Sequence, residues 1–313
     1  MKGIIVKSTG SWYVVRDEAG NHYECRMKGK MRTDDSKATN PIVVGDNVEF
    51  ELEVDNNEKK FGVISELLKR KNYIIRKSTN LSKQAHIIAA NMDQAFLIAT
   101  VANPRTSSGF IDRFLITAEA YSIPASIIFN KIDIYTADDK QILKQLKDLY
   151  EAIGYPCYEV SAITGQGLQE LKDKMKGKVT LMSGHSGVGK SSLINTIEPK
   201  LNLRTGDISD AHSKGTHTTT FAEMFELSNS GFIIDTPGIK ELGIIDIEKN
   251  ELSHFFPEMR ALFNQCKFNS CMHVNEPKCA VLAAVEQKKI AQSRYHTYIS
   301  ILNGDELLKE YEK

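Results

Sequence analysis

A glycine-rich loop at 184–191, which reads Gly-His-Ser-Gly-Val-Gly-Lys-Ser, has the most specific chemistry in the chain. The glycines allow backbone N–H groups to converge on phosphate oxygens, while Lys190 suits the β and γ phosphates and Ser191 suits Mg²⁺. An apolar run at 179–183 precedes the loop and a helical period follows from Lys190, which is the context that the motif requires. We therefore predict that nucleotide phosphates contact Gly184, His185, Ser186, Gly187, Val188, Gly189, Lys190, Ser191 and Ser192.

Residues upstream of this loop have the chemistry of guanine recognition. The motif Asn-Lys-Ile-Asp at 130–133 ends an apolar strand, and the Asp133 carboxylate can accept hydrogen bonds from the N1 and N2 donors of guanine. Adenine lacks this donor pair, so a buried Asp133 left unpaired against ATP would cost about 1–3 kcal/mol. The loop at 161–165 offers a backbone N–H for the guanine O6. We predict GTP as the nucleotide, with its base at Asn130, Lys131, Asp133, Ser161 and Ala162.

Two downstream segments have the chemistry of a γ-phosphate sensor. The motif Asp235-Thr-Pro-Gly238 follows an apolar run at 232–234, so Asp235 suits a water-mediated Mg²⁺ contact and the Gly238 N–H suits the γ-phosphate. A threonine-rich stretch at 214–220 suits a switch that orders around Mg²⁺ and the γ-phosphate. The sequence does not decide which threonine ligates Mg²⁺, and Thr219 is our candidate beside Ser191.

The order of these motifs is unusual. The base motif and base loop come first, then the phosphate loop, then the two switches, whereas ordinary GTPases begin with the phosphate loop. Circular permutation preserves a domain whose original termini lie close together, because the packed sheet is unaltered. The sequence therefore predicts a GTP-hydrolysing P-loop domain in circularly permuted order.

Three cysteines and a histidine form a second cluster with a different chemistry. The pattern Cys-x₄-Cys-x-His-x₅-Cys at 266–279 supplies three thiolates and one imidazole, enough for a closed tetrahedral site. A catalytic zinc would keep an open coordination position, so we predict one structural Zn²⁺ held by Cys266, Cys271, His273 and Cys279. The other two cysteines, Cys25 and Cys157, lie alone in strand-like runs and are expected to be buried.

The elements that position these groups fall into three regions. Short strand-like runs separated by turn residues fill the first 70 or so residues and predict a small five-stranded barrel. From about residue 95, apolar strands alternate with helical periods, which is typical of a parallel sheet with helical crossovers. The cysteine cluster and a charged helical stretch follow. We predict a multi-domain chain with a barrel at 1–68, an α/β P-loop GTPase domain at 69–245 and a mostly α-helical zinc-binding domain at 246–313.

Composition limits the partners of the whole molecule. The 40 Lys and Arg balance the 40 Asp and Glu, so any RNA contact must come from local basic patches. No apolar run approaches the ~20 residues that span a bilayer, and the N-terminus lacks the continuous apolar core of a secretory signal. We expect a cytoplasmic protein without a membrane partner, and a monomer is the default expectation.

Taken together, the permuted motifs, the barrel and the Cys/His cluster closely resemble the bacterial RsgA (YjeQ/YloQ) family of small-ribosomal-subunit biogenesis GTPases. The resemblance rests on the motifs above and on Ala-Ala-Asn-Met-Asp at 89–93 and spans nearly the whole chain. It implies an OB-fold barrel that binds RNA, a structural zinc domain, and a role late in assembly of the 30S subunit with its 16S rRNA, with GTP bound, hydrolysed and released as GDP.

The resemblance also bears on hydrolysis. Ile239 stands where many GTPases carry a water-orienting glutamine, and its side chain cannot form hydrogen bonds. Because the family is thought to use a histidine in the first switch, His217 is our catalytic candidate, together with Lys190 and Thr219. A solvated loop histidine is the alternative interpretation of His217. We expect slow hydrolysis by the free protein and faster hydrolysis on the small subunit.

Local basic clusters are the candidates for RNA contact. They are Arg26–Arg32, Lys69–Lys71 and three residues of the C-terminal helix, Lys288, Lys289 and Arg294, with Trp12 and Tyr13 as a stacking surface. Such charge runs are more often solvated faces. Two other functions stay open, namely an RNA-binding scaffold without physiological turnover and a GTP switch that serves another RNA or protein partner.

Overall fold

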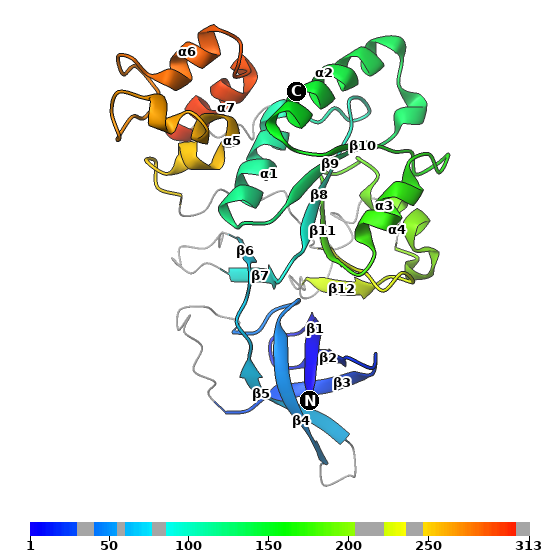
Figure 1. Ribbon diagram of the computed structural model, residues 1–313. Coiled ribbons are helices and arrows are strands. Elements are labelled where there is room, and N and C mark those ends of the chain that lie inside the picture. Colours follow the sequence, from blue (N-terminus) through cyan, green and yellow to red (C-terminus); the bar gives the residue numbers. More distant parts are fainter. Residues whose placement is uncertain (30–40, 55–59, 77–85, 204–221, 236–246, 305–313) are drawn as a thin grey trace.

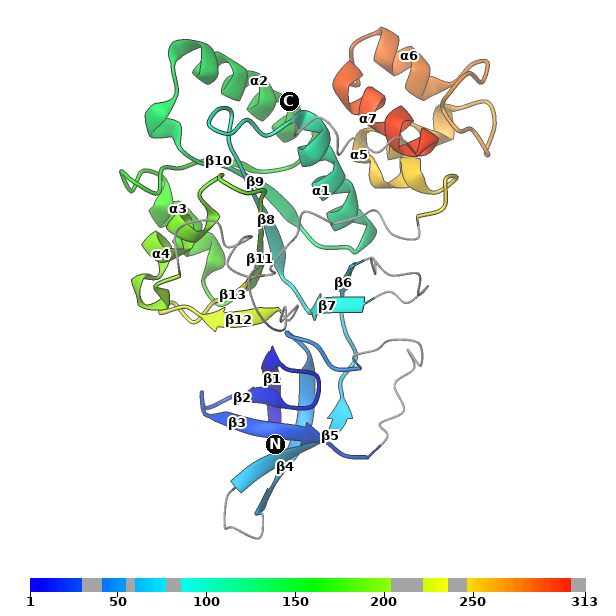
Figure 2. The ribbon, with the colours of Figure 1, turned by 180° about the vertical axis from the view of Figure 1, so that it is seen from behind.

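The computed structural model describes residues 1–29, 41–54, 60–76, 86–203, 222–235 and 247–304. Three regions are evident, with the N-terminal barrel at one end of the α/β domain and the C-terminal helices packed beside it (Figure 1). The same arrangement is seen from behind in Figure 2. None of the helices within the described ranges is long and apolar enough to cross a membrane.

The N-terminal region is a five-stranded barrel of the OB type. Its strands are β1 (Lys2–Ser8), β2 (Tyr13–Asp17), β3 (His22–Met27), β4 (Asn47–Val54) and β5 (Lys60–Leu67). β1, β2 and β3 pair antiparallel in sequence, β3 runs parallel to β5, and β4 pairs with both β5 and β1 and so closes the barrel. Gly62 is required inside it, because a Cβ there would lie 2.2 Å from the Cys25 sulfur. The expected barrel is therefore confirmed.

The central region is a parallel sheet with one antiparallel edge strand. In spatial order its strands are β10 (Cys157–Glu159), β9 (Ala125–Phe129), β8 (Gln94–Ala99), β11 (Val179–Ser183), β13 (Phe232–Asp235) and β12 (Glu223–Glu226). All of them except β12 are parallel. The crossover helices are α1 (Ser108–Ala120), α2 (Ala137–Ile153), α3 (Leu168–Met175) and α4 (Lys190–Ile197), with short 3-10 turns at Ile132–Ile134 and Pro199–Leu201.

Alternate residues of β8 face two separate cores. Leu97 packs with α1 and α2 on one face of the sheet, whereas Phe96 and Ile98 pack with α3 and α4 on the other. Because helices bury both faces of the sheet, β8 is apolar from Ala95 to Ala99. The α/β domain with helices on both faces of its sheet is therefore confirmed.

The barrel joins the central sheet at its β12 edge. β1 pairs antiparallel with β12 at Lys7 and Glu223, so one continuous sheet runs through both regions. A hairpin of β6 (Tyr73–Arg76) and β7 (His86–Ala90), which the sequence patterns did not predict, lies beside the junction. The Asn91 side chain donates to the Gly45 carbonyl there at 2.9 Å.

The C-terminal region is a small helical unit that packs on α1. It contains α5 (Pro257–Arg260), α6 (Ala280–Glu286) and α7 (Gln292–Asn303), with 3-10 turns at Leu252–Phe255 and Phe263–Gln265. Its apolar core includes Phe256, Tyr298 and the α1 residue Ile116. Arg294 on α7 is fully buried and donates to Asp112 of α1 at 2.9 Å. This contact removes Arg294 from the candidate RNA contacts, because its charge is sequestered between two elements.

Candidate nucleotide-binding site and metal centre

The predicted nucleotide motifs converge because the strands before them are parallel. β8, β9, β10, β11 and β13 point the same way, so their carboxyl ends share one edge of the sheet. Open α/β sheets bind their ligands at this edge. The base motif at 130–133, the base loop at 161–165 and the phosphate loop at 184–191 therefore meet there, although the chain supplies them in permuted order.

Asn130 connects all three of these segments. Its side-chain N–H donates to the Val188 carbonyl of the phosphate loop at 2.9 Å, and its side-chain oxygen accepts the Ala162 N–H of the base loop at 3.3 Å. The residue is 1% exposed, and its carbonyl accepts the Tyr135 hydroxyl at 2.6 Å. Because every polar group of the side chain is used, Asn130 fixes the base segments relative to the phosphate segment.

Lys131 and Asp133 are less buried than the other two residues of the base motif. Lys131 has a φ of +66°, and its ammonium donates to the Asn103 carbonyl at 2.6 Å. The Asp133 carboxylate accepts the Ser161 hydroxyl at 2.5 Å, and that hydroxyl in turn accepts the Thr164 N–H. Asp133 is exposed, which differs from the buried carboxylate assumed in the sequence argument. The predicted preference for guanine over adenine therefore requires that a bound base cover the carboxylate.

The phosphate loop has the compact geometry that its glycines allow. Gly187 and Gly189 have φ of +82° and +87°. A Cβ on Gly184 would lie 2.7 Å from the Ile98 carbonyl oxygen, and a Cβ on Gly189 would lie 2.6 Å from the side-chain nitrogen of Asn130. Since these approaches exclude any larger residue, the loop is pinned between β8 and the base motif. α4 begins directly after it, so Lys190, Ser191 and Ser192 lie in the first helical turn.

The remaining nucleotide residues are only partly described. Asp235 ends β13 at the same sheet edge, in register with Met182 of β11. His217, Thr219 and Gly238 lie outside the described residues, so their roles in water orientation, Mg²⁺ ligation and γ-phosphate contact stay predictions.

A loop that no motif predicted also belongs to this site. Residues 100–106 connect β8 to α1 and contact the phosphate loop twice: the Thr106 hydroxyl lies 2.8 Å from the His185 ring, and Pro104 packs on Gly187. The same loop supplies the Asn103 carbonyl that Lys131 contacts. Its position directly after a parallel strand was the only signal in the sequence, because every such strand end reaches the ligand edge.

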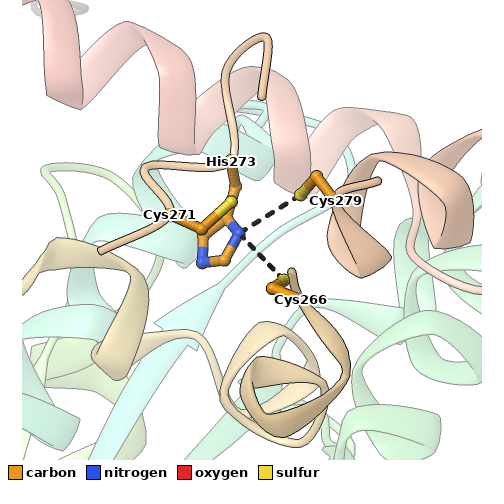
Figure 3. Close-up of side chains that lie close together, drawn as sticks. All are labelled: Cys266, Cys271, His273 and Cys279. Carbon is orange, nitrogen blue, oxygen red and sulfur yellow. Dashed lines mark hydrogen bonds between the residues drawn. The ribbon is translucent and has the colours of Figure 1, made fainter. Parts of the chain in front are cut away.

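The Cys/His cluster forms a compact potential metal centre. Cys266, Cys271, His273 and Cys279 come together so that one ligand atom from each lies within 4.8 Å of the others. The His273 Nδ1 faces the Cys279 and Cys266 sulfurs at 3.3 and 3.8 Å (Figure 3). Four ligands arranged tetrahedrally around one cation would be separated by about 3.5–3.8 Å. The cluster can therefore hold a metal ion.

The surroundings of the cluster fix its loop. Burial lowers the pKa of His273, which favours the neutral imidazole that metals bind. The Tyr295 hydroxyl donates to the His273 carbonyl at 2.8 Å, and Phe263 stacks on the His273 ring at 5.3 Å. The Glu276 carboxylate accepts the backbone N–H groups of Met272, Val274 and Asn275. These contacts orient the ligands in advance of a metal.

Several residues expected to contact RNA have structural roles instead. Tyr13 is buried in the barrel core and offers no stacking face, whereas Trp12 beside it is exposed. The Arg70 guanidinium donates twice to the buried carboxylate of Asp46, each time at 2.7 Å. Lys71 pairs with Asp93. Arg70 and Lys71 therefore stabilise the junction between the barrel and the α/β domain, whereas Lys69 is exposed.

Comparison with known proteins agrees with this architecture. The sequence model of the RsgA GTPase matches residues 67–245, and that of the RsgA N-terminal domain matches residues 2–64. Relatives named small ribosomal subunit biogenesis GTPase RsgA include one from Christiangramia forsetii, 53% identical over 98% of this chain and 97% of the relative. One from Flavobacterium psychrophilum is 54% identical over 98% and 94%.

Two solved structures share the fold along almost the whole chain. YjeQ from Thermotoga maritima superimposes with a TM-score of 0.78 at 38% identity, over 97% of this chain and 98% of that one. YloQ, described as a circularly permuted GTPase, gives 0.75 at 30% identity, over 100% and 96%. With its permuted motifs on one sheet edge, its barrel and its Cys/His centre, the chain belongs to the RsgA GTPase family.

Proposed function

We propose that this protein is a GTP hydrolase that acts on the small ribosomal subunit during its biogenesis. The observation that carries the nucleotide chemistry is Asn130, which bonds to both Val188 and Ala162 and so joins base and phosphate segments in one site. The named role of the relatives in small-subunit biogenesis supports the partner. A cytoplasmic location follows from that partner, because subunits are assembled there.

Within this proposal, each predicted residue has a defined task. Lys190 and the loop amides hold the phosphates, Ser191 and Thr219 ligate Mg²⁺, and His217 orients the attacking water. Contact with 16S rRNA is assigned to the barrel, where Trp12, Arg26 and Lys28 remain candidates, while residues 30–32 of the same basic cluster lie outside the described residues. The monomeric state is a separate prediction that sedimentation of the free protein tests.

The metal centre is assigned to one structural Zn²⁺. Three thiolates and an imidazole are the donors that zinc prefers, and a full set of four leaves no open position for catalysis. All four ligands belong to a short loop-rich segment, so metal binding is expected to contribute much of the folding free energy of residues 252–303.

The deciding experiment measures phosphate release from GTP with and without purified small subunits. We expect a large increase on the subunit for the natural protein and none for Lys190→Ala. Lys200→Ala, an exposed lysine just beyond α4, is the matched control and should behave as the natural protein does. Turnover that does not change with subunits, together with nucleotide-independent co-sedimentation, would instead favour the RNA-binding scaffold that Ile239 suggests.

A further inference from the structure

The loop at 100–106 is closed by two buried threonines. The Thr106 N–H donates to the Thr100 carbonyl at 2.8 Å, and the Thr100 N–H donates to the Thr106 hydroxyl at 2.9 Å. The Thr100 hydroxyl donates to the Pro104 carbonyl, and Thr106 is 4% exposed. The loop therefore has an internal framework that fixes the Thr106 side chain at the edge of the phosphate loop.

The hydrogen bonds of His185 determine which of its nitrogens carries the proton. In the neutral imidazole one nitrogen donates and the other accepts, and Nδ1, which lies 3.0 Å from the Ser186 carbonyl, an acceptor only, is the donor. Nε2 is then an acceptor, and the Thr106 hydroxyl 2.8 Å away donates to it. Thr106 thus accepts from Thr100 and donates to His185 through one hydroxyl. The edge-to-face contact with Phe110, with ring centroids 5.5 Å apart, holds the imidazole in this orientation.

Further contacts extend the same framework across the site. A Cβ on Gly187 would lie 3.2 Å from the Pro104 ring, so the phosphate loop rests directly on the 100–106 loop. Lys131 of the base motif donates to the Asn103 carbonyl on the other side. The loop therefore contacts both halves of the nucleotide site, and Thr106 is its link to the phosphate half through a side-chain hydrogen bond.

We infer that Thr106 is a positioning residue, which acts through His185 to hold the phosphate loop in its nucleotide-binding shape before GTP arrives. This inference rests on the proposed function, because it concerns the same GTP site. Preorganisation improves affinity by removing the ordering cost that binding would otherwise carry. It therefore acts on nucleotide affinity and KM, while kcat depends on the switches and should change less than twofold.

Two substitutions separate this role from a purely structural one. Thr106→Val keeps the side-chain volume and removes the hydroxyl, whereas His185→Phe keeps the ring against Phe110 and removes both nitrogens. Dissociation constants for GTP and GDP are measured by equilibrium titration, and KM and kcat for hydrolysis are measured beside them. Each variant should weaken both nucleotides about fivefold to tenfold, the worth of one hydrogen bond.

The double variant and two controls decide the result. Thr106→Val with His185→Phe should weaken binding by clearly less than the product of the two single effects, since the Thr106–His185 hydrogen bond is lost in each of them. Thr106→Ser retains the hydroxyl and should restore affinity. Thr117→Val, the same change at a buried α1 threonine whose hydroxyl bonds within the helix to the Arg113 carbonyl, should leave affinity unchanged.

Additive losses in the double variant, unchanged affinity in both single variants, or a Thr106→Ser protein as weak as Thr106→Val would each overturn the inference. A natural protein that does not bind GTP would instead refute the proposed function, so the two failures are distinguishable.

Discussion

Arg294→Ala tests how the metal-binding region is held on the GTPase domain. The Arg294 guanidinium donates to Asp112 at 2.9 Å and to the two oxygens of Glu258 at 2.7 and 3.2 Å. It also lies over the Phe256 ring, 4.7 Å from the centroid. Arg294 and Asp112 both have side chains that are 0% exposed. The substitution leaves the Asp112 carboxylate buried, and among the described residues its remaining side-chain donors are the hydroxyls of Tyr150 and Thr297.

The expected loss follows from this burial. Removing one partner of a buried ion pair costs about 3–5 kcal/mol, because the other charge stays desolvated and unpaired. Burial already raises the pKa of Asp112, which Arg294 opposes, so without the arginine the carboxyl takes up a proton more easily. This neutralisation places the expected loss at the lower end, about 3 kcal/mol. Adding Asp112→Asn should recover part of it, since no buried charge then remains on α1.

The chain provides a matched control for this substitution. Arg260 of α5 also pairs with α1, because its guanidinium lies 3.2 Å from the Glu119 carboxylate. The Arg260 side chain is, however, 50% exposed and that of Glu119 is 25% exposed. Arg260→Ala should therefore cost at most about 1 kcal/mol. Hydrogen exchange of the α7 amides over a urea series reports the free energy of opening for both variants. Equal losses in the two, or a loss below 1 kcal/mol for Arg294→Ala, would refute the reasoning from burial.

Three further predictions concern recognition of the guanine base, the bound metal, and the Asp139 carboxylate in the first turn of α2. Asp133→Asn should weaken GTP and favour xanthosine triphosphate, as measured by competition binding; unchanged preference would place the base elsewhere. Removal of the metal by a chelator should unfold residues 252–303, as measured by hydrogen exchange, and should leave GTP binding intact. Loss of GTP binding together with the unfolding would contradict separate folding of the two regions. The Thr136 hydroxyl and N–H donate to Asp139 and lower its pKa below 3.8. These hydrogen bonds to the Asp139 carboxylate stabilise α2 above the ordinary pKa of the carboxyl group, and the stabilisation is lost as the pH falls through the lowered pKa. Because Thr136→Val removes the hydroxyl donor, the Asp139 pKa measured by NMR titration should rise in that variant.

Local patterns were sufficient for the parts of the fold that are defined by short-range physics. The apolar run at 179–183 and the glycines after it predicted β11 and the phosphate loop, because burial of both strand faces and close backbone approach leave few residue choices. The close spacing of the four ligands between Cys266 and Cys279 likewise predicted the cluster, since local folding of one short segment is enough to bring them together.

Features that depend on distant partners were not predictable in this way. β12 is four residues long with a glutamate at each end, and it is a strand because β13 and β1 pair with it. Arg294 has the charge of a surface residue, and its burial is explained by Asp112 and Glu258, two carboxylates that are distant from it in sequence. The role of Thr106 required the fold as well, because no phosphate-loop motif includes the residues that pack beside it.

The pairing of β1 with β12 has a consequence for solubility. An outermost strand offers unpaired N–H and C=O groups to any passing chain, and is a common route to aggregation. Here β1 covers that rim, and the ion pairs Lys7–Glu223 and Arg16–Glu226 flank the contact. The opposite rim, β10, is only three residues long and makes a poor template. A GTPase domain produced without its barrel would lose the pairing at Glu223, and the shortness of β12 and the glutamates at its two ends would then have to oppose edge-to-edge association, so the barrel adds to the protection of this rim.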